Sequence, residues 1–191
     1  MEVQPQAAPS VVAVVVAERP GPGFDELLTS LAGQDYPNLS VLVIDVATDE
    51  NLAARVAAHL PAAYVRRLET NPGFGPAANE ALRLVEGAGF FCFLHDDVAL
   101  EPTTIRALVE EAFRSNAGIV GPKLVEWDDP RRLLAVGMGA DKAGVLVSLV
   151  EPGELDQEQH DAVRDVFVVP SACMPVGRIV TLWTGSAWGS T

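Results

Sequence analysis

Residues 90–97 have the sequence Phe-Phe-Cys-Phe-Leu-His-Asp-Asp, in which an apolar run ends in polar side chains. A short, continuous apolar run is typical of a strand that is buried on both faces of a parallel sheet. We therefore predict a strand over residues 89–94, and similar runs predict strands over residues 11–17 and 41–45. Residues 63–68 are expected to form a further strand between the second and the last of these.

The segments between these strands show helical spacing of their apolar residues. The expected helices cover residues 24–32, 50–60, 76–85 and 102–114. Alternation of strands and helices predicts an α/β fold, a mostly parallel sheet that is flanked by helices on both faces. The pattern then weakens into irregular strands and turns, and one more strand is expected over residues 163–169.

The chain has 191 residues, enough for one domain of ordinary size. We expect residues 1–10 to be a flexible leader, residues 11–174 to form the domain and residues 175–191 to be an atypical tail. Its 13 basic and 26 acidic residues give a net charge of −13. This balance argues against a nucleic-acid partner, because no basic surface is available to neutralise phosphates.

Other sequence features bear on where in the cell the protein works and on which kinds of metal or catalytic site it contains. The longest apolar run, residues 11–17, is too short to be a transmembrane segment, and no signal peptide is evident, so a cytoplasmic protein is expected. Cys92 and Cys173 are far apart and predict neither a disulfide framework nor a zinc site. The chain also lacks the G-x-S-x-G, Walker A and H-E-x-x-H motifs.

Polar residues follow several of the predicted strands. In open α/β sheets, ligands bind at the carboxyl ends of the strands, which here are residues 17–19, 45–49, 71–75 and 95–97. The adjacent carboxylates of Asp96 and Asp97, with His95 beside them, have the oxygen ligands that suit a divalent cation such as Mg²⁺ or Mn²⁺. The alternative for this pair is a solvated loop or a cap for the next helix.

The segment Gly73-Phe74-Gly75-Pro76-Ala77-Ala78 fits the G-x-G-x-x-A fingerprint of dinucleotide-binding proteins. One alternative function is therefore a Rossmann-type NAD-dependent oxidoreductase. That fingerprint normally follows the first strand, whereas two strand–helix units precede it here, and Asn71 and Asn79 have no role in it. A further alternative is that these glycines only allow a tight turn before a helix.

Three blocks, in this order, resemble family 2 glycosyltransferases of the GT-A type, especially the bacterial rhamnosyl- and galactofuranosyl-transferase branch. The first block is Asn71-Pro72-Gly73-Phe74-Gly75-Pro76-Ala77-Ala78-Asn79, and the second is Leu94-His95-Asp96-Asp97-Val98-Ala99-Leu100-Glu101-Pro102. The third is Val120-Gly121-Pro122-Lys123-Leu124, followed by Val136-Gly137 and Ser171-Ala172-Cys173-Met174. The order and spacing of these blocks agree with the family over most of the chain.

The resemblance implies a GT-A-like domain that transfers a sugar, with inversion, from a UDP-, GDP- or dTDP-linked donor to a glycan or lipid-linked acceptor of the cell envelope. Such an enzyme would work in the cytoplasm or at the inner face of the membrane. The residues implied in donor nucleotide binding are Ala17, Glu18, Arg19, Asp45, Asn71, Gly73, Phe74 and Asp96. Asp97 matches the metal-binding aspartate, and His95 stands where the first aspartate of the D-x-D motif is common.

The chain departs from this family pattern after Met174. In the family, a segment that carries the catalytic base carboxylate follows, whereas residues 181–191 of this chain are uncharged. We therefore expect a truncation or a shifted reading frame after about Met174, and the base is not identified. The alternative function is a nucleotide-sugar-binding domain without transfer activity. Residues from 175 onward are expected to add little to the fold, unless residues 178–183 form a strand at the sheet edge.

Overall fold

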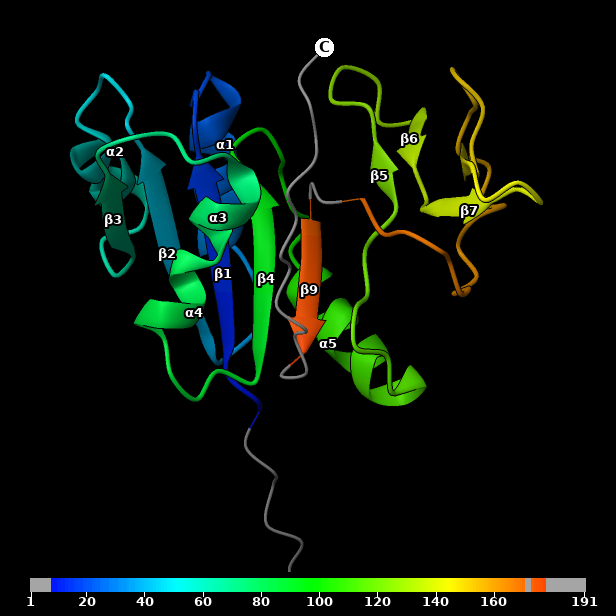
Figure 1. Ribbon diagram of the computed structural model, residues 1–191, viewed down its shortest axis with the longest axis horizontal. Helices are drawn as coiled ribbons and strands as arrows, with labels where there is room; N and C mark the ends of the chain where they lie inside the picture. The colour runs from blue at the N-terminus through cyan, green and yellow to red at the C-terminus, as the bar shows by residue number, and fades with distance from the viewer. Residues whose placement is uncertain (1–7, 171–172, 178–191) are drawn as a thin grey trace, which may run out of the picture.

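The computed structural model describes residues 8–170 and 173–177, the latter without the side chains of residues 174–177. A five-stranded sheet with the strand order β3-β2-β1-β4-β9 forms its centre (Figure 1). Its strands are β1 (Val11–Ala17), β2 (Leu39–Val46), β3 (Tyr64–Leu68), β4 (Phe90–His95) and β9 (Cys173–Gly177). The helices are α1 (Gly23–Ala32), α2 (Leu52–His59), α3 (Phe74–Ala78), α4 (Glu80–Leu84) and α5 (Thr104–Ser115).

Strands β1 to β4 are all parallel, which confirms the predicted α/β architecture. Side chains that alternate along each strand enter two separate cores. Val12, Val14 and Val16 of β1 pack with residues of α3 and α4 on one face. Ala13 and Val15 pack with residues of α1, α2 and α5 on the other. Burial on both faces is the reason why these strands are apolar throughout.

Strand β9 runs antiparallel to β4 and extends the sheet across the boundary that was expected at residue 174. Pro175 lies opposite Cys92 in the register, and an edge strand tolerates a proline, which cannot donate a ladder hydrogen bond. The pairing brings the buried Sγ atoms of Cys92 and Cys173 to 3.9 Å, although the two residues are far apart in sequence. The hydrogen bond with Cys173, together with burial, raises the pKa of the Cys92 thiol well above its ordinary value.

The part of the chain that follows α5 and precedes β9 forms a smaller region with two short antiparallel pairs of strands. This region lies beside the main sheet in Figure 1. The pairs are β5 (Leu124–Val125) with β6 (Leu133–Ala135), and β7 (Met138–Ala140) with β8 (Leu146–Ser148). The strand predicted over residues 163–169 was wrong: within it, only Val168 forms a bridge, to Met138. Val166 packs instead against Gly137, and Val169 packs against Gly121. A side chain on either glycine would leave no room for the valine that faces it.

The helix predicted over residues 76–85 is two short helices, α3 and α4, that meet at Asn79. Of the expected leader, residues 1–7 lie outside the described residues. Residues 8–10 are held by hydrogen bonds, among them Tyr36 Oη to the Pro9 carbonyl at 2.7 Å. Residues 178–183, the expected alternative strand, also lie outside the described residues. Within the part of the chain that the structure describes, no helix has the length and apolar composition to cross a bilayer.

Candidate functional site

A cleft of about 700 Å³ opens at the carboxyl ends of the parallel strands β1, β2 and β3. Its lining residues come from the last residue of β2 and from the segments that follow β1, β2 and β3: Glu18, Arg19, Pro20, Val46, Ala47, Thr48, Asp49, Glu50 and Asn71. Glu18, Arg19 and Asn71 were predicted as site residues. Thr48 and Asp49 lie within the predicted strand end at residues 45–49 but were not named as site residues, and Glu50 lies just outside that range.

The Asp96 carboxylate joins the end of β4 to the end of β1. Its Oδ2 atom accepts hydrogen bonds from the backbone N–H groups of Glu18 at 2.9 Å and Arg19 at 3.1 Å. A carboxylate that accepts two backbone N–H groups forms charge-assisted hydrogen bonds, which are stronger than neutral ones. Asp96 therefore fixes the backbone that leaves β1 and enters the cleft.

Asn71 connects the same backbone to the loop that follows β3. Its Nδ2 donates to Glu18 Oε1 at 2.5 Å, and its Oδ1 accepts from the Gly73 N–H at 2.7 Å. Gly73 has a φ of 86° and a ψ of 165°, a conformation that is essentially restricted to glycine. Together with Asp96, these contacts form one network, which we call the strand-end network: Glu18, Arg19, Asn71, Gly73 and Asp96.

Asp45 lies at the end of β2, where its carboxylate is almost fully buried. Oδ1 accepts from the Thr48 N–H at 3.0 Å and from Thr48 Oγ1 at 2.8 Å. Oδ2 accepts from Arg67 Nη1 at 2.9 Å, and Arg67 Nη2 donates to the Thr48 carbonyl at 2.8 Å. Asp45 and Ala17 are both buried, and neither is among the residues that line the cleft, so their expected place beside the nucleotide stays a prediction.

Arg55 of α2, which the sequence analysis missed, holds the segment between β1 and α1. Its guanidinium donates to the carbonyls of Pro20 at 3.4 Å and Gly21 at 2.7 Å. It also pairs with Asp25 at 2.7 Å and with Glu50 at 2.9 Å. The hydrogen bond between Arg55 and Asp25 lowers the pKa of the Asp25 carboxyl and raises the pKa of the Arg55 guanidinium. An arginine on an alanine-rich helix gives no sequence signal of this role.

The candidate metal ligands lie at the end of β4. Asp97 is exposed in the turn after the strand, while the His95 ring packs against Phe74 with ring centroids 4.3 Å apart. Among residues 8–170 and 173–177, no group of three or more His, Cys, Asp or Glu side chains is arranged to hold a metal. Mg²⁺ commonly takes one or two carboxylates and completes its shell with water and substrate phosphates. The exposed Asp97 carboxylate, next to Asp96, fits such a shared site.

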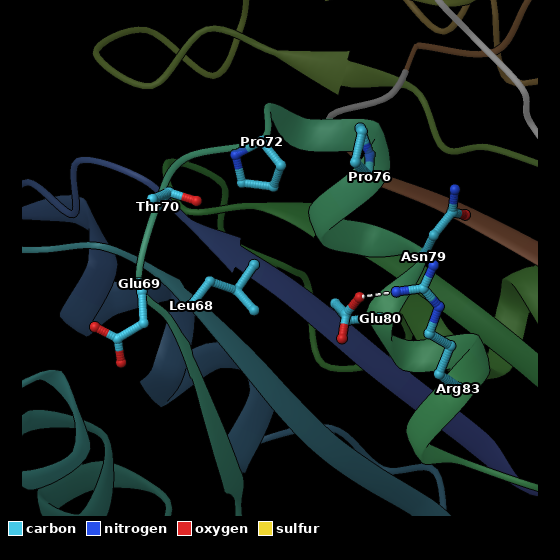
Figure 2. Close-up of a pocket in the computed structure, with 8 residues that line it drawn as sticks. All are labelled: Leu68, Glu69, Thr70, Pro72, Pro76, Asn79, Glu80 and Arg83. Carbon is cyan, nitrogen blue, oxygen red and sulfur yellow. Dashed lines mark hydrogen bonds and ion pairs between the residues drawn. The ribbon is translucent and has the colours of Figure 1, made fainter.

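A second pocket of about 370 Å³ lies between the loop after β3 and helices α3 and α4 (Figure 2). Figure 2 shows Pro72 and Thr70 on the loop side and Asn79 on the helix side, with an ion pair between Glu80 and Arg83. None of the predicted site residues lines this pocket. The larger cleft is therefore the candidate functional site.

Comparison with known protein families shows to which family the chain belongs. A family model described as glycosyl transferase family 2 matches residues 10–158, which is most of the chain and includes the whole strand-end network. The chain is a member of glycosyltransferase family 2. This family 2 chain has the GT-A-like fold that was predicted, with four central parallel strands flanked by helices. No curated protein matches it.

Solved structures agree with this family and fold. S. aureus TarS 1–349 is 25% identical, with a TM-score of 0.56 over 63% of this chain and 37% of that chain. TarS 1–349 is also known in complex with UDP-GlcNAc, and there the match is 26% identical, with a TM-score of 0.54 over 60% and 34% of the two chains. A mannosyltransferase from Pyrobaculum calidifontis, PcManGT, in complex with GDP-Man and Mn²⁺, is 26% identical, with a TM-score of 0.53 over 66% and 40%. The family 2 chain thus spans little more than a third of the length of these relatives.

Proposed function

We propose that this chain carries the donor-binding site of a glycosyltransferase that moves a sugar from a nucleotide sugar to a glycan or lipid-linked acceptor, with inversion at the anomeric carbon. The single observation that carries the proposal is the strand-end network, which joins the ends of β1 and β4 and the loop after β3 beside the large cleft. Solved structures with a similar fold are complexes with UDP-GlcNAc and with GDP-Man, which supports a nucleotide-sugar ligand.

The charges of the cleft support a diphosphate ligand only together with a cation. Glu18, Asp49 and Glu50 line the cleft, and Arg19 is the one basic residue among the lining residues. A bare diphosphate would be repelled by these carboxylates, because like charges raise the energy of a complex. We therefore expect nucleoside diphosphate binding to depend on a divalent cation held by Asp97, with His95 as a second candidate ligand.

The reaction needs an acceptor hydroxyl to attack the anomeric carbon from the face opposite to the leaving group. The acceptor hydroxyl would pass its proton to a base carboxylate as its oxygen bonds to the anomeric carbon. The bond from that carbon to the diphosphate oxygen breaks, and the nucleoside diphosphate leaves with the bonding electron pair. The strand-end network would fix the backbone that orients the donor for this displacement. When bound, a divalent cation would act as a Lewis acid that neutralises the diphosphate leaving group.

The sequence blocks around Asn71, Asp97 and Gly121 support placement in the rhamnosyl- and galactofuranosyl-transferase branch. An acceptor in the cell envelope, reached from the cytoplasmic face of the membrane, would follow from that placement. A transfer assay with UDP-, GDP- and dTDP-linked sugars would identify the donor from the nucleotide released.

Calorimetry with UDP, GDP and dTDP, each with and without Mn²⁺, tests the proposal. We expect heat with at least one nucleotide and only when Mn²⁺ is present. Asp97→Ala should remove this heat, whereas Glu110→Ala, which removes an exposed carboxylate from α5, should not. No heat with any nucleotide would contradict the proposal, and binding without turnover would favour a donor-binding domain that does not transfer sugar.

A further inference from the structure

Trp127 lies against the first residue of α1, although more than a hundred residues separate them. A Cβ atom added to Gly23 would lie 3.3 Å from Cη2 and 3.5 Å from Cζ2 of the indole. The ring edge therefore sits where the absence of a side chain on Gly23 leaves room for it. Even so, Trp127 keeps 46% of its surface exposed.

The segment that carries Trp127 is an ordered turn between β5 and β6. Glu126 N–H donates to the Arg132 carbonyl at 2.9 Å, and Arg132 N–H donates to the Asp129 carbonyl at 2.8 Å. The Asp129 carboxylate pairs with Arg131 at 2.8 Å and with Arg132 at 3.3 Å. These bonds hold the turn closed, so the exposure of the indole results from a defined backbone and not from a missing core contact.

The place of this indole matters because the segment before Gly23 borders the cleft. Arg19 and Pro20 line the cleft, and Arg55 fixes the carbonyls of Pro20 and Gly21. Trp127 therefore reaches from the turn between β5 and β6 to the first residue of α1, three residues after Pro20, which lines the cleft. An exposed aromatic face of this kind can pack against the C–H face of a sugar ring, because both surfaces are apolar and flat.

We propose that Trp127 is a binding residue for a sugar ring at the rim of the cleft, which rests on the proposed function above. The ring belongs either to the donor or to the acceptor, since both are carbohydrates with the same stacking chemistry. On the proposed function, the nucleoside diphosphate part of the donor would lie among the strand ends, where it requires no contact with the indole. Trp127 therefore contributes to recognition of the sugar and not of the nucleotide.

Fluorescence of Trp127 tests this assignment directly. Trp183→Phe with Trp188→Phe leaves Trp127 as the only tryptophan, because the chain has three. Emission is followed while nucleoside diphosphates, the matching nucleotide sugars, or methyl glycosides of rhamnose, galactose, glucose and mannose are added with Mg²⁺. A response to nucleotide sugars alone identifies the donor sugar, and a response to a methyl glycoside in the presence of the diphosphate identifies the acceptor. Either response supports the proposal.

Substitutions separate a binding role from a structural one. Trp127→Leu should weaken binding of the responding sugar ligand by up to about tenfold and leave the affinity for the nucleoside diphosphate unchanged. Trp127→Phe should retain most of the affinity, and Tyr64→Leu, which removes an exposed aromatic side chain from the far edge strand, should have no effect. An equal loss for diphosphate and sugar ligand would overturn the proposal.

Calorimetry on the same samples shows which of the two proposals fails. If a nucleoside diphosphate binds while no sugar changes the emission of Trp127, the assignment of Trp127 is overturned and the proposed function stands. If the diphosphate does not bind and no sugar changes the emission, both are overturned. A methyl glycoside that responds without nucleotide binding would support the assignment of Trp127 and contradict the proposed donor site.

Discussion

Asp45 and Arg67 are register partners on β2 and β3, and they form an ion pair of 2.9 Å in which the carboxylate side chain is 3% exposed and the arginine 51%. The pair also clamps Thr48, whose carbonyl accepts from Arg67 at 2.8 Å. Thr48, Asp49 and Glu50 line one part of the cleft. The position of this segment therefore depends on the ion pair between Asp45 and Arg67, which holds Thr48.

Arg67→Gln should lower the free energy of unfolding by about 1–3 kcal/mol, because a buried carboxylate loses its charged partner. Arg66→Gln, an exposed neighbour on the other face of β3, is the matched control and should change stability by less than about 0.5 kcal/mol. Urea unfolding measures both. Equal stability of the two variants would show that the pair with Asp45 contributes nothing.

Gly73→Ala should destabilise the loop after β3, because a φ of 86° with a ψ of 165° is strained for any residue with a side chain. The expected cost is about 1–3 kcal/mol. No atom lies within 4 Å of the added Cβ, so the cost would come from the backbone alone. Gly118→Ala has equal space and no positive φ, and its thermal unfolding midpoint should stay near that of the unchanged chain.

Asp97→Ala should abolish the Mn²⁺-dependent part of nucleotide binding, because an exposed carboxylate at the end of β4 is the candidate metal ligand. His95→Ala should weaken that binding less, since the His95 ring packs against Phe74 at 4.3 Å. Calorimetric titration at several Mn²⁺ concentrations compares them. Small and equal effects of both changes would mean that residues 95–97 form only a solvated turn.

Glu154 should titrate far below an ordinary glutamate. The Glu151 N–H, the Gln159 amide and His160 all stabilise its charged form and lower its pKa from 4.5 to about 2. A lowered carboxyl pKa adds stability above pH 4.5, and this contribution is lost as the pH falls toward 2. The amide chemical shift of Glu151, followed by NMR, should change with a midpoint near pH 2 in the unchanged chain and show no such step in Glu154→Gln. A midpoint near 4.5 would contradict this contact.

Two deletions test how far the sheet depends on β9. Removing residues 175–191 deletes three of the five β4–β9 register pairs and should lower the thermal unfolding midpoint, because β4 then loses a neighbour along an apolar strand. Removing residues 178–191 leaves all five pairs in place and should lower the midpoint less. If both deletions lower it equally, the contribution of β9 is negligible.

The parallel part of the fold could be predicted because its strands are buried on both faces. Each of β1, β2 and β4 therefore carries its own signal in a continuous apolar run, such as Val11–Ala17. Strand β9 carries no such signal, since it depends on a distant partner, β4, and contains Pro175. The strand expected over residues 163–169 failed for the opposite reason: its valines have strand propensity, but Val163 and Phe167 stay exposed without a paired strand.

The site could be predicted at the level of strand ends but not of side chains. The rule that ligands bind at the carboxyl ends of parallel strands led to Glu18, Arg19 and Asn71, which line the cleft. It could not show that Asp45 turns inward to Arg67, because that depends on register between β2 and β3. Nor could it find Arg55, whose partners are mostly backbone carbonyls and carboxylates some 30 positions away.

Strands β4 and β9 lie side by side in the sheet, yet the chain between them passes through α5 and the whole region from β5 to β8. Helix α5 packs in the core with β1. Among the described residues, those of β5 to β8 contribute to neither core, so the region from β5 to β8 can change in length without shifting the register of the four parallel strands. The strand-end network takes none of its hydrogen bonds from this region. The region from β5 to β8 can therefore differ between related chains, and bring different contacts with it, while the strand-end network stays the same.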